Sequence, residues 1–195
     1  MMNLSRANVI TAIAALLGTG VAASWTAADE GTLKRLLPSG KAVRAGWVRV
    51  KESFQYGAGK NLTKIYNGGY QMYLDHGVID AAQVGYKSKA GYTTLTLHTM
   101  KSPSACRSFY DYWRKEAADQ GKVTAMKVAD AAFVYHPSKN TTYAYLRNGR
   151  YLLIADVSLG GEIGVKVLRS FLESVSKAAT DLQRPPKKKP RGAAS

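Results

Sequence analysis

The dipeptide Asn148-Gly149 lies between two runs that resemble β-strands, residues 141–147 and 150–157. Asn-Gly is the strongest two-residue signal for a β-hairpin, because both residues readily adopt a positive φ. The second run contains three consecutive apolar residues at 152–154, which is typical of a central strand covered on both faces. The sequence therefore predicts an antiparallel sheet around this hairpin.

Further strands and two amphipathic helices follow from the same kind of pattern. Residues 78–87 and 92–100 predict a hairpin with its turn at 88–91, and residues 131–136 predict a strand closed by Pro137. Ser102 followed by Pro103 indicates the start of a helix that ends at Gly121. Its predicted buried stripe is Cys106, Phe109, Trp113 and Ala117. A last helix is expected at 162–179, where apolar residues recur at helical spacing.

A pair of glycines interrupts another helical pattern. Residues 61–77 begin with a capping asparagine and end with a glycine, and apolar residues recur between them at helical spacing. Each interior glycine costs a helix about 1 kcal/mol relative to alanine. We therefore expect Gly68 and Gly69 to lie inside a helix that packs closely against the sheet.

These elements predict one α+β domain at about residues 41–180, an antiparallel sheet with helices packed on it. Their order is helix, hairpin, helix, three strands and helix. A chain of 195 residues with 46% hydrophobic residues is long enough for one sizeable core and short for two.

The N-terminus has the pattern of a secretory signal peptide. Arg6 precedes an uncharged apolar run at 7–23, and small residues offer cleavage after Ala23 or as late as Ala28. An uncleaved membrane anchor is the alternative, but Thr11, Gly18, Thr19 and Gly20 dilute the run. We expect a signal peptide at 1–23, a basic segment at 24–40, and export to the periplasm or the outside of a bacterium.

The charge is strongly positive, with 28 Lys and Arg against 13 Asp and Glu. Part of the excess lies in a proline- and lysine-rich tail at 181–195, which we expect to be disordered, with Lys187, Lys188, Lys189 and Arg191 as its basic surface. Such a tail favours a loose attachment to an anionic surface of the envelope. It also resembles a nuclear localisation signal, which the export signal argues against, and we expect no specific nucleic-acid binding.

Several of these motifs together resemble a bacterial exported family, domain of unknown function 6599. They are residues 65–69 with 72–77, the stretch 100–105 around Ser102-Pro103, and residues 148–152. The resemblance covers about residues 46–179, and it departs from the family at His76 and Cys106. It implies the fold and an exported location, and the family carries no assigned activity.

Common enzyme motifs do not occur in the sequence, so we predict no catalytic residue and no cofactor. His76, His98 and His136 are widely spaced, and we expect them to be independent rather than a metal site with Asp75. Cys106 is the single cysteine and is expected to be a buried small residue.

Tyrosine is abundant, with twelve copies. Aromatic side chains beside polar groups suit sugars, nucleotides or peptides. The candidate binding residues are Tyr66, Asn67, Tyr70, Tyr73, Tyr143 and Tyr145. The leading hypothesis is a non-catalytic exported module that binds an unknown protein, an envelope polymer or a small ligand. The alternatives are a hydrolase-like or other enzyme assembled from scattered residues such as His98, Asp156 and Tyr70, and a basic structural protein of the envelope.

Overall fold

The computed structural model describes residues 28–39, 43–44 and 46–183. The helices and strands are, in chain order, α1 (Glu30–Leu36), β1 (Val48–Arg49), β2 (Gln55–Ala58), the 3-10 helix η1 (Gly59–Lys64), α2 (Tyr70–Asp75), β3 (Val78–Lys87), β4 (Tyr92–Met100), α3 (Pro103–Gln120), β5 (Thr124–Met126), β6 (Ala131–Ser138), β7 (Thr141–Asn148), β8 (Tyr151–Val157) and α4 (Gly161–Gln183). The predicted signal peptide at 1–23 and the basic residues Lys187, Lys188, Lys189 and Arg191 lie outside the described residues.

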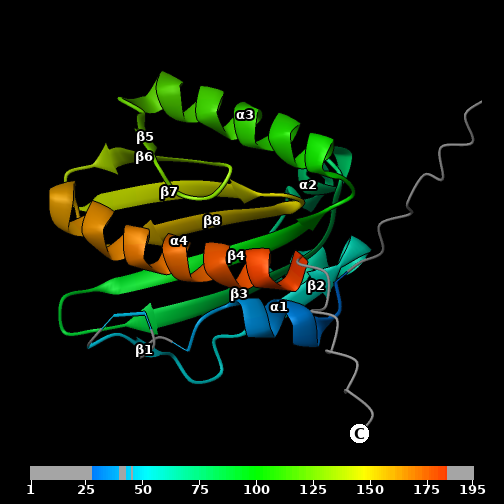
Figure 1. The fold of residues 1–195 in the computed structure, drawn as a ribbon, viewed down its shortest axis with the longest axis horizontal. Coiled ribbons are helices and arrows are strands. Elements are labelled where there is room, and N and C mark those ends of the chain that lie inside the picture. The colour runs from blue at the N-terminus through cyan, green and yellow to red at the C-terminus, as the bar shows by residue number, and fades with distance from the viewer. Residues whose placement is uncertain (1–27, 40–42, 45, 184–195) are drawn as a thin grey trace, which may run out of the picture.

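The eight strands form one sheet in the order β1-β3-β4-β8-β7-β6-β5, and β2 also pairs with β3. Every pairing is antiparallel. This confirms the predicted α+β fold, in which the helices pack on an antiparallel sheet (Figure 1). No helix in the described part of the chain is long and apolar enough to cross a membrane.

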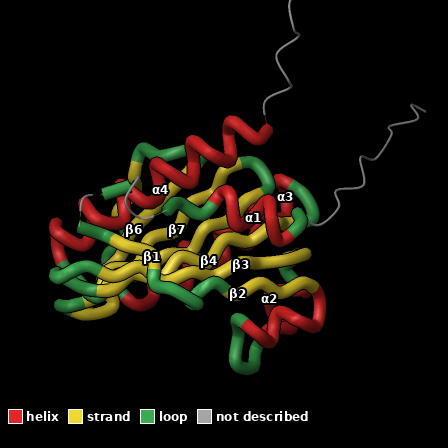
Figure 2. The backbone as a smooth tube through the Cα atoms, turned by 90° about the horizontal axis from the view of Figure 1, so that it is seen from below, coloured by secondary structure: helices red, strands yellow, loops and turns green. Residues whose placement is uncertain are grey.

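One face of the sheet is covered by α1 and α4. Leu33 of α1 and Phe171 and Leu172 of α4 are fully buried there, in a core shared with alternate residues of the strands. Burial of each such side chain stabilises the fold by about 1.5–3 kcal/mol. Figure 2 shows α1 and α4 on one side of the strands and α2 on the other.

The opposite face is covered by η1, α2 and α3. Ser102 caps α3 as predicted, because its side chain accepts a hydrogen bond from the amide of Ala105, and Pro103 occupies the first turn. Cys106 and Phe109 are fully buried against the sheet. Tyr110 is buried as well, whereas Trp113 of the predicted stripe is only partly buried.

The predicted hairpin at Asn148 is present, with its turn moved by one residue. Asn148 pairs with Tyr151 as the last residue of β7, so Gly149 and Arg150 make the turn, and Gly149 has a φ of 57°. The Asn148 side chain instead donates to the carbonyl oxygen of Ser176 (3.0 Å) and to Oγ1 of Thr180 (3.0 Å). Asn148 therefore fastens α4 to the sheet.

The predicted single helix at 61–77 is wrong. The segment forms η1, a turn and the short helix α2, with Gly68 at φ 85° and Gly69 at φ 68°. A Cβ on either glycine would meet no other atom within 4 Å in the described part of the chain. The pair is therefore needed for left-handed backbone at a chain reversal, not for close packing. Gly57 of β2 does have the close approach, since a Cβ there would lie 2.2 Å from the carbonyl oxygen of Asn61.

The folded body also extends past the expected limits of 41 and 180. Leu33, Leu36 and Leu37 are buried in the core, although they belong to the segment expected to precede the domain. At the other end, α4 continues to Gln183. The sequence patterns did not predict α1, β1, β2 or β5, which are all short.

We predict that Gly68→Ala and Gly69→Ala each lower the free energy of unfolding by about 1–2 kcal/mol, because an L-residue is strained in left-handed backbone. Gly121→Ala is the matched control. Gly121 has an extended φ of 165°, and a Cβ there would meet only the carbonyl oxygen of His136 at 3.8 Å, so its stability should change little. Urea unfolding of the three variants measures the difference. Equal effects at all three positions would contradict this account.

Candidate functional site

The strand pairings place a row of polar and aromatic residues across the face that α3 covers only in part. Asp156 of β8 lies opposite Thr94 of β4 on one side and opposite Tyr143 of β7 on the other. The row continues to Gly85 of β3 next to Thr94, and to Tyr135 of β6 next to Tyr143. Side chains of directly paired residues on one face of a sheet are neighbours. Thr94, Tyr143 and Asp156 are each partly exposed.

A second row lies beside the first, two residues further along each strand. It consists of Gln83, Thr96, Ile154, Tyr145 and Phe133. Nε2 of Gln83 donates a hydrogen bond to Oγ1 of Thr96 at 2.9 Å, so both polar side chains are held in place. Gln83 and Ile154 remain partly exposed.

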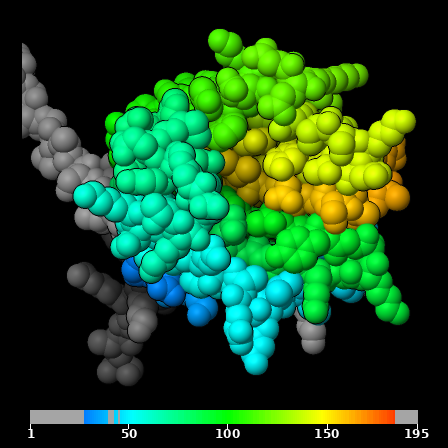
Figure 3. Space-filling view, turned by 180° about the vertical axis from the view of Figure 1, so that it is seen from behind, coloured from blue at the N-terminus to red at the C-terminus, as the bar shows by residue number. Residues whose placement is uncertain are grey.

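A wall of aromatic rings lies beside the second row. The rings of Tyr66 and Tyr73 are stacked with 3.7 Å between centroids, and Tyr73 lies 6.3 Å from Trp113. Trp113 in turn lies 5.7 Å from Tyr145 of the second row. We call this region the tyrosine hollow. Its floor is formed by Gln83, Thr94, Tyr143, Ile154 and Asp156, and its wall is formed by Tyr66, Tyr73 and Trp113. Figure 3 shows this face hollowed between the η1–α2 segment, α3 and the strands, with yellow-gold atoms of the β7–β8 region at its base.

His98 anchors the wall from below. Tyr66 Oη bonds to Nε2 of His98, and Nδ1 of His98 bonds to the carbonyl oxygen of Leu152 at 2.9 Å. Complete burial lowers the pKa of His98 to about 4. The ring is therefore neutral at pH 7, with Nδ1 as the donor to Leu152 and Nε2 as the acceptor from Tyr66. This arrangement fixes the position of the Tyr66 ring.

Asp156 is the one carboxylate in the two rows. Burial raises the pKa of its carboxyl to about 6, and a hydrogen bond from Thr94 opposes part of that rise. Above that pH the hollow therefore holds one carboxylate beside a threonine hydroxyl and the Tyr143 ring. A partly buried carboxylate in such a position is a strong acceptor for hydroxyl groups.

The structure brings four of the six predicted binding residues into or next to the tyrosine hollow. Tyr66 and Tyr73 form the wall, Tyr143 lies on the floor, and Tyr145 is buried behind Trp113. Asn67 is exposed in the turn between η1 and α2. Tyr70 begins α2 and packs partly buried against the core on the same side of the sheet.

Several residues of the hollow were not among the predicted ones. The helical pattern predicts Trp113 in the buried stripe of its helix, and no motif in the sequence indicates Gln83 as a binding residue. Thr94 and Thr96 lie two residues apart on β4, so strand alternation alone puts them on the same face. Their partners on β8 could not be inferred, since β4 and β8 are separated by α3 and three other strands in the chain.

The residues considered for a scattered enzyme site are not brought together. His98 pairs with Leu152, and Leu152 precedes Asp156 by four residues on β8, which corresponds to about 13 Å along the strand. His76 stacks on Phe109, and His136 bonds to Oγ1 of Thr142 at 3.0 Å. Within residues 28–39, 43–44 and 46–183 no three His, Cys, Asp or Glu side chains form a group that could hold a metal ion. Burial raises the pKa of Cys106 to about 12, so this thiol is a poor nucleophile.

Fold and site together define a small α+β domain whose sheet is closed on one face and hollowed on the other. No family model and no curated protein sequence matches the chain. Among solved structures, the chain is similar to the extracellular domain of PknH from Mycobacterium tuberculosis, with a TM-score of 0.51 and 9% identity. The match covers 77% of this chain and 97% of that one. At this identity the likeness shows a shared fold.

We predict that the stability of the protein depends on pH through Asp156. A folded-state pKa near 6, above the ordinary value of 3.8, means that the contribution of Asp156 to stability is fully present below about pH 4 and is lost as the pH rises through 6. The free energy of unfolding of Asp156→Asn, measured relative to that of the parent protein, should therefore be about 1–3 kcal/mol more favourable to the variant at pH 7 than at pH 4.

Urea unfolding at the two pH values measures this difference. The stability of Asp156→Asn should still fall as the pH rises, but less than that of the parent protein, because burial also raises the pKa of Asp80 to about 6. A stability difference between Asp156→Asn and the parent protein that is the same at pH 4 and pH 7 would contradict the prediction.

Proposed function

We propose that the protein is an exported, non-catalytic module that binds a carbohydrate chain in the tyrosine hollow. The export part rests on the signal-peptide pattern at 1–23. A similar fold serves as the extracellular domain of PknH, which fits this location. The binding part rests on the hollow, and the observation that carries it is the position of Asp156 between Thr94 and Tyr143.

The chemistry of the hollow suits a polyhydroxyl ligand. The apolar face of a sugar ring packs against aromatic rings, and Tyr143 on the floor and Trp113 in the wall are both partly exposed. The sugar hydroxyls need hydrogen-bond partners, and Asp156, Thr94 and Gln83 supply acceptors and donors within the same two rows. Neither row contains a lysine or arginine. A phosphate or nucleotide would therefore meet the Asp156 carboxylate without a compensating positive charge, so a neutral ligand is favoured.

Binding is favoured over hydrolysis at this site. Most glycoside hydrolases use two carboxyl groups about 5–9.5 Å apart, one as acid and one as base or nucleophile. Asp156 is the single carboxyl group in the two rows. The hydrolase-like alternative therefore lacks its second group on the floor of the hollow.

The basic tail supplies a second feature of the proposal. Lys187, Lys188, Lys189 and Arg191 are outside the described residues, and their attachment to an anionic envelope surface stays a prediction from charge alone. Such an attachment would hold the domain near an envelope polymer without taking part in the recognition by the hollow.

We predict that the mature chain, residues 24–195, binds short neutral oligosaccharides with a Kd of about 1 mM or tighter. Chitotriose and cellotriose serve as probes, and isothermal titration calorimetry measures the affinity. Tyr143→Ala and Asp156→Asn should each weaken binding by about tenfold or more, because each removes a direct contact worth about 1–3 kcal/mol.

Two matched variants are the controls. Tyr56→Ala removes a partly buried tyrosine of β2 that packs against the core on the opposite face of the sheet, and Asp111→Asn removes an exposed carboxylate of α3. Both should leave the affinity within about twofold of the parent. The proposal is rejected if neither probe binds, or if the control variants weaken binding as much as the variants in the hollow.

A further inference from the structure

A second cavity lies on another part of the same face, between α3 and the strands β5, β6 and β7. Its volume is about 280 Å³, and its polar lining comes from Arg107, Asp111 and Arg114 of α3 and Arg147 of β7. Arg147 is four residues from Tyr143 along β7, or about 13 Å, so this cavity is separate from the tyrosine hollow. It is called the arginine pocket below.

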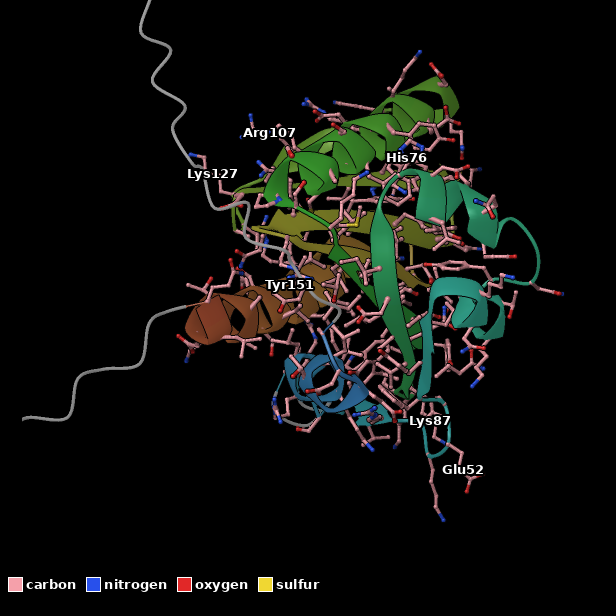
Figure 4. All side chains as sticks on the ribbon, turned by 90° about the vertical axis from the view of Figure 1, so that its right-hand side faces the viewer. Glu52, His76, Lys87, Arg107, Lys127 and Tyr151 are labelled. Carbon is pink, nitrogen blue, oxygen red and sulfur yellow. The ribbon has the colours of Figure 1, made fainter. Side chains whose placement is uncertain are left out.

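The helix supplies two arginines to one side of the pocket. Arg107, Asp111 and Arg114 follow the i, i+4, i+7 spacing that places side chains on one face of a helix. Both arginines are exposed, and in the described part of the chain no ion pair joins Asp111 to either of them. Figure 4 shows Arg107 on α3 on the same side of the molecule as Lys127. This side therefore carries excess positive charge.

The sheet supplies the third arginine, and this one is largely buried. The Arg147 side chain is 14% exposed, and its Nη1 lies 3.4 Å from Oδ2 of Asp130. That same carboxylate oxygen also accepts a hydrogen bond from the amide of Gly149 at 2.8 Å. The Nε atom of Arg147 is buried and has no hydrogen-bond partner among the described residues. The guanidinium of Arg147 has five N–H donors, and Asp130 engages only one of its nitrogens, so the donors of Arg147 that reach the pocket can bind an oxyanion.

Three guanidinium groups therefore line one small cavity against the two carboxylates Asp111 and Asp130. Guanidinium groups bind the oxygens of phosphate through paired hydrogen bonds. The oxygens of a tetrahedral phosphate point in several directions. A phosphate can therefore accept hydrogen bonds both from the arginines of α3 and from Arg147 of β7. The buried walls formed by Tyr110 and Phe133 lower the local dielectric and strengthen these contacts.

We propose that the arginine pocket binds the phosphate group of a phosphate ester. This site is independent of carbohydrate binding in the tyrosine hollow. The ester comes either from a soluble phosphorylated molecule or from the headgroup of an anionic lipid, and both present the same group to Arg107, Arg114 and Arg147.

The first test uses pyrophosphate and glycerol 3-phosphate as probes with the mature chain, residues 24–195, at constant ionic strength set with sodium chloride. Nitrogen-15 NMR follows the Nε–Hε signal of Arg147, which should shift in a saturable way with at least one probe. Arg107→Gln with Arg114→Gln should weaken binding by about tenfold or more, because two charge-assisted contacts are lost. Both positions are exposed, so the double variant should still fold.

The matched control makes the same change at two exposed arginines outside the pocket, Arg35→Gln with Arg169→Gln. This control loses the same charge and should keep its affinity within about twofold. Equal weakening in the two double variants would show a non-specific charge effect and overturn the proposal. An Arg147 Nε–Hε signal that does not shift with either probe would overturn it as well.

A second arm distinguishes the two sources of phosphate. Vesicles of phosphatidylcholine with or without phosphatidylglycerol are sedimented with the parent protein and the two double variants. Retention on phosphatidylglycerol that Arg107→Gln with Arg114→Gln reduces, and the control does not, identifies a lipid headgroup. Saturable binding of glycerol 3-phosphate, with equal vesicle retention of the two double variants, identifies a soluble ester. Either pattern supports a phosphate site when the Arg147 signal shifts in the first test, and without that shift the proposal is rejected.

Discussion

The pairing of β4 with β8 is the constraint on which the rest of the structure depends. It joins the hairpin β3–β4 to the strands β6, β7 and β8, which follow α3 in the chain. Its register places Leu97 opposite Leu153 on one face and Thr94 opposite Asp156 on the other. A slip of one residue would exchange the two faces of a strand, because successive side chains point in opposite directions. The core and the hollow are therefore set by the same register.

The two faces of this sheet receive unequal cover. On one face α4 runs for 23 residues and α1 fills the space beside it, so alternate strand residues such as Leu153 and Ala155 are closed off from solvent. On the other face α3 is shorter, at 18 residues, and α2 has only six. Ile154, which lies between those two buried residues in the chain, is left partly exposed. The tyrosine hollow is the part of the sheet that the helices on this face do not reach.

Local signals in the sequence predicted most of the long elements, since a capping serine with a proline, or an alternating run beside Asn-Gly, acts within a few residues. The glycine pair was misread because the helical spacing on either side of Gly68 and Gly69 belongs to two short helices, η1 and α2. Tyrosine content pointed to Tyr143 as a candidate. Asp156, which lies opposite Tyr143, and Trp113, which lies beside Tyr145, could not be assigned to a common site, because strand pairing and helix packing bring them to this face.

The central claim, that one face of the sheet is closed and the other is open at the tyrosine hollow, has a direct test. A soluble gadolinium chelate broadens the NMR signals of methyl groups that it can approach in solution. The account predicts strong broadening for Ile154 and Thr94 and little for Leu153 and Leu95, although the strand neighbours are adjacent in sequence. If the Ile154 and Thr94 methyl groups are protected as well as those of Leu153 and Leu95, the hollow is filled and the account is contradicted.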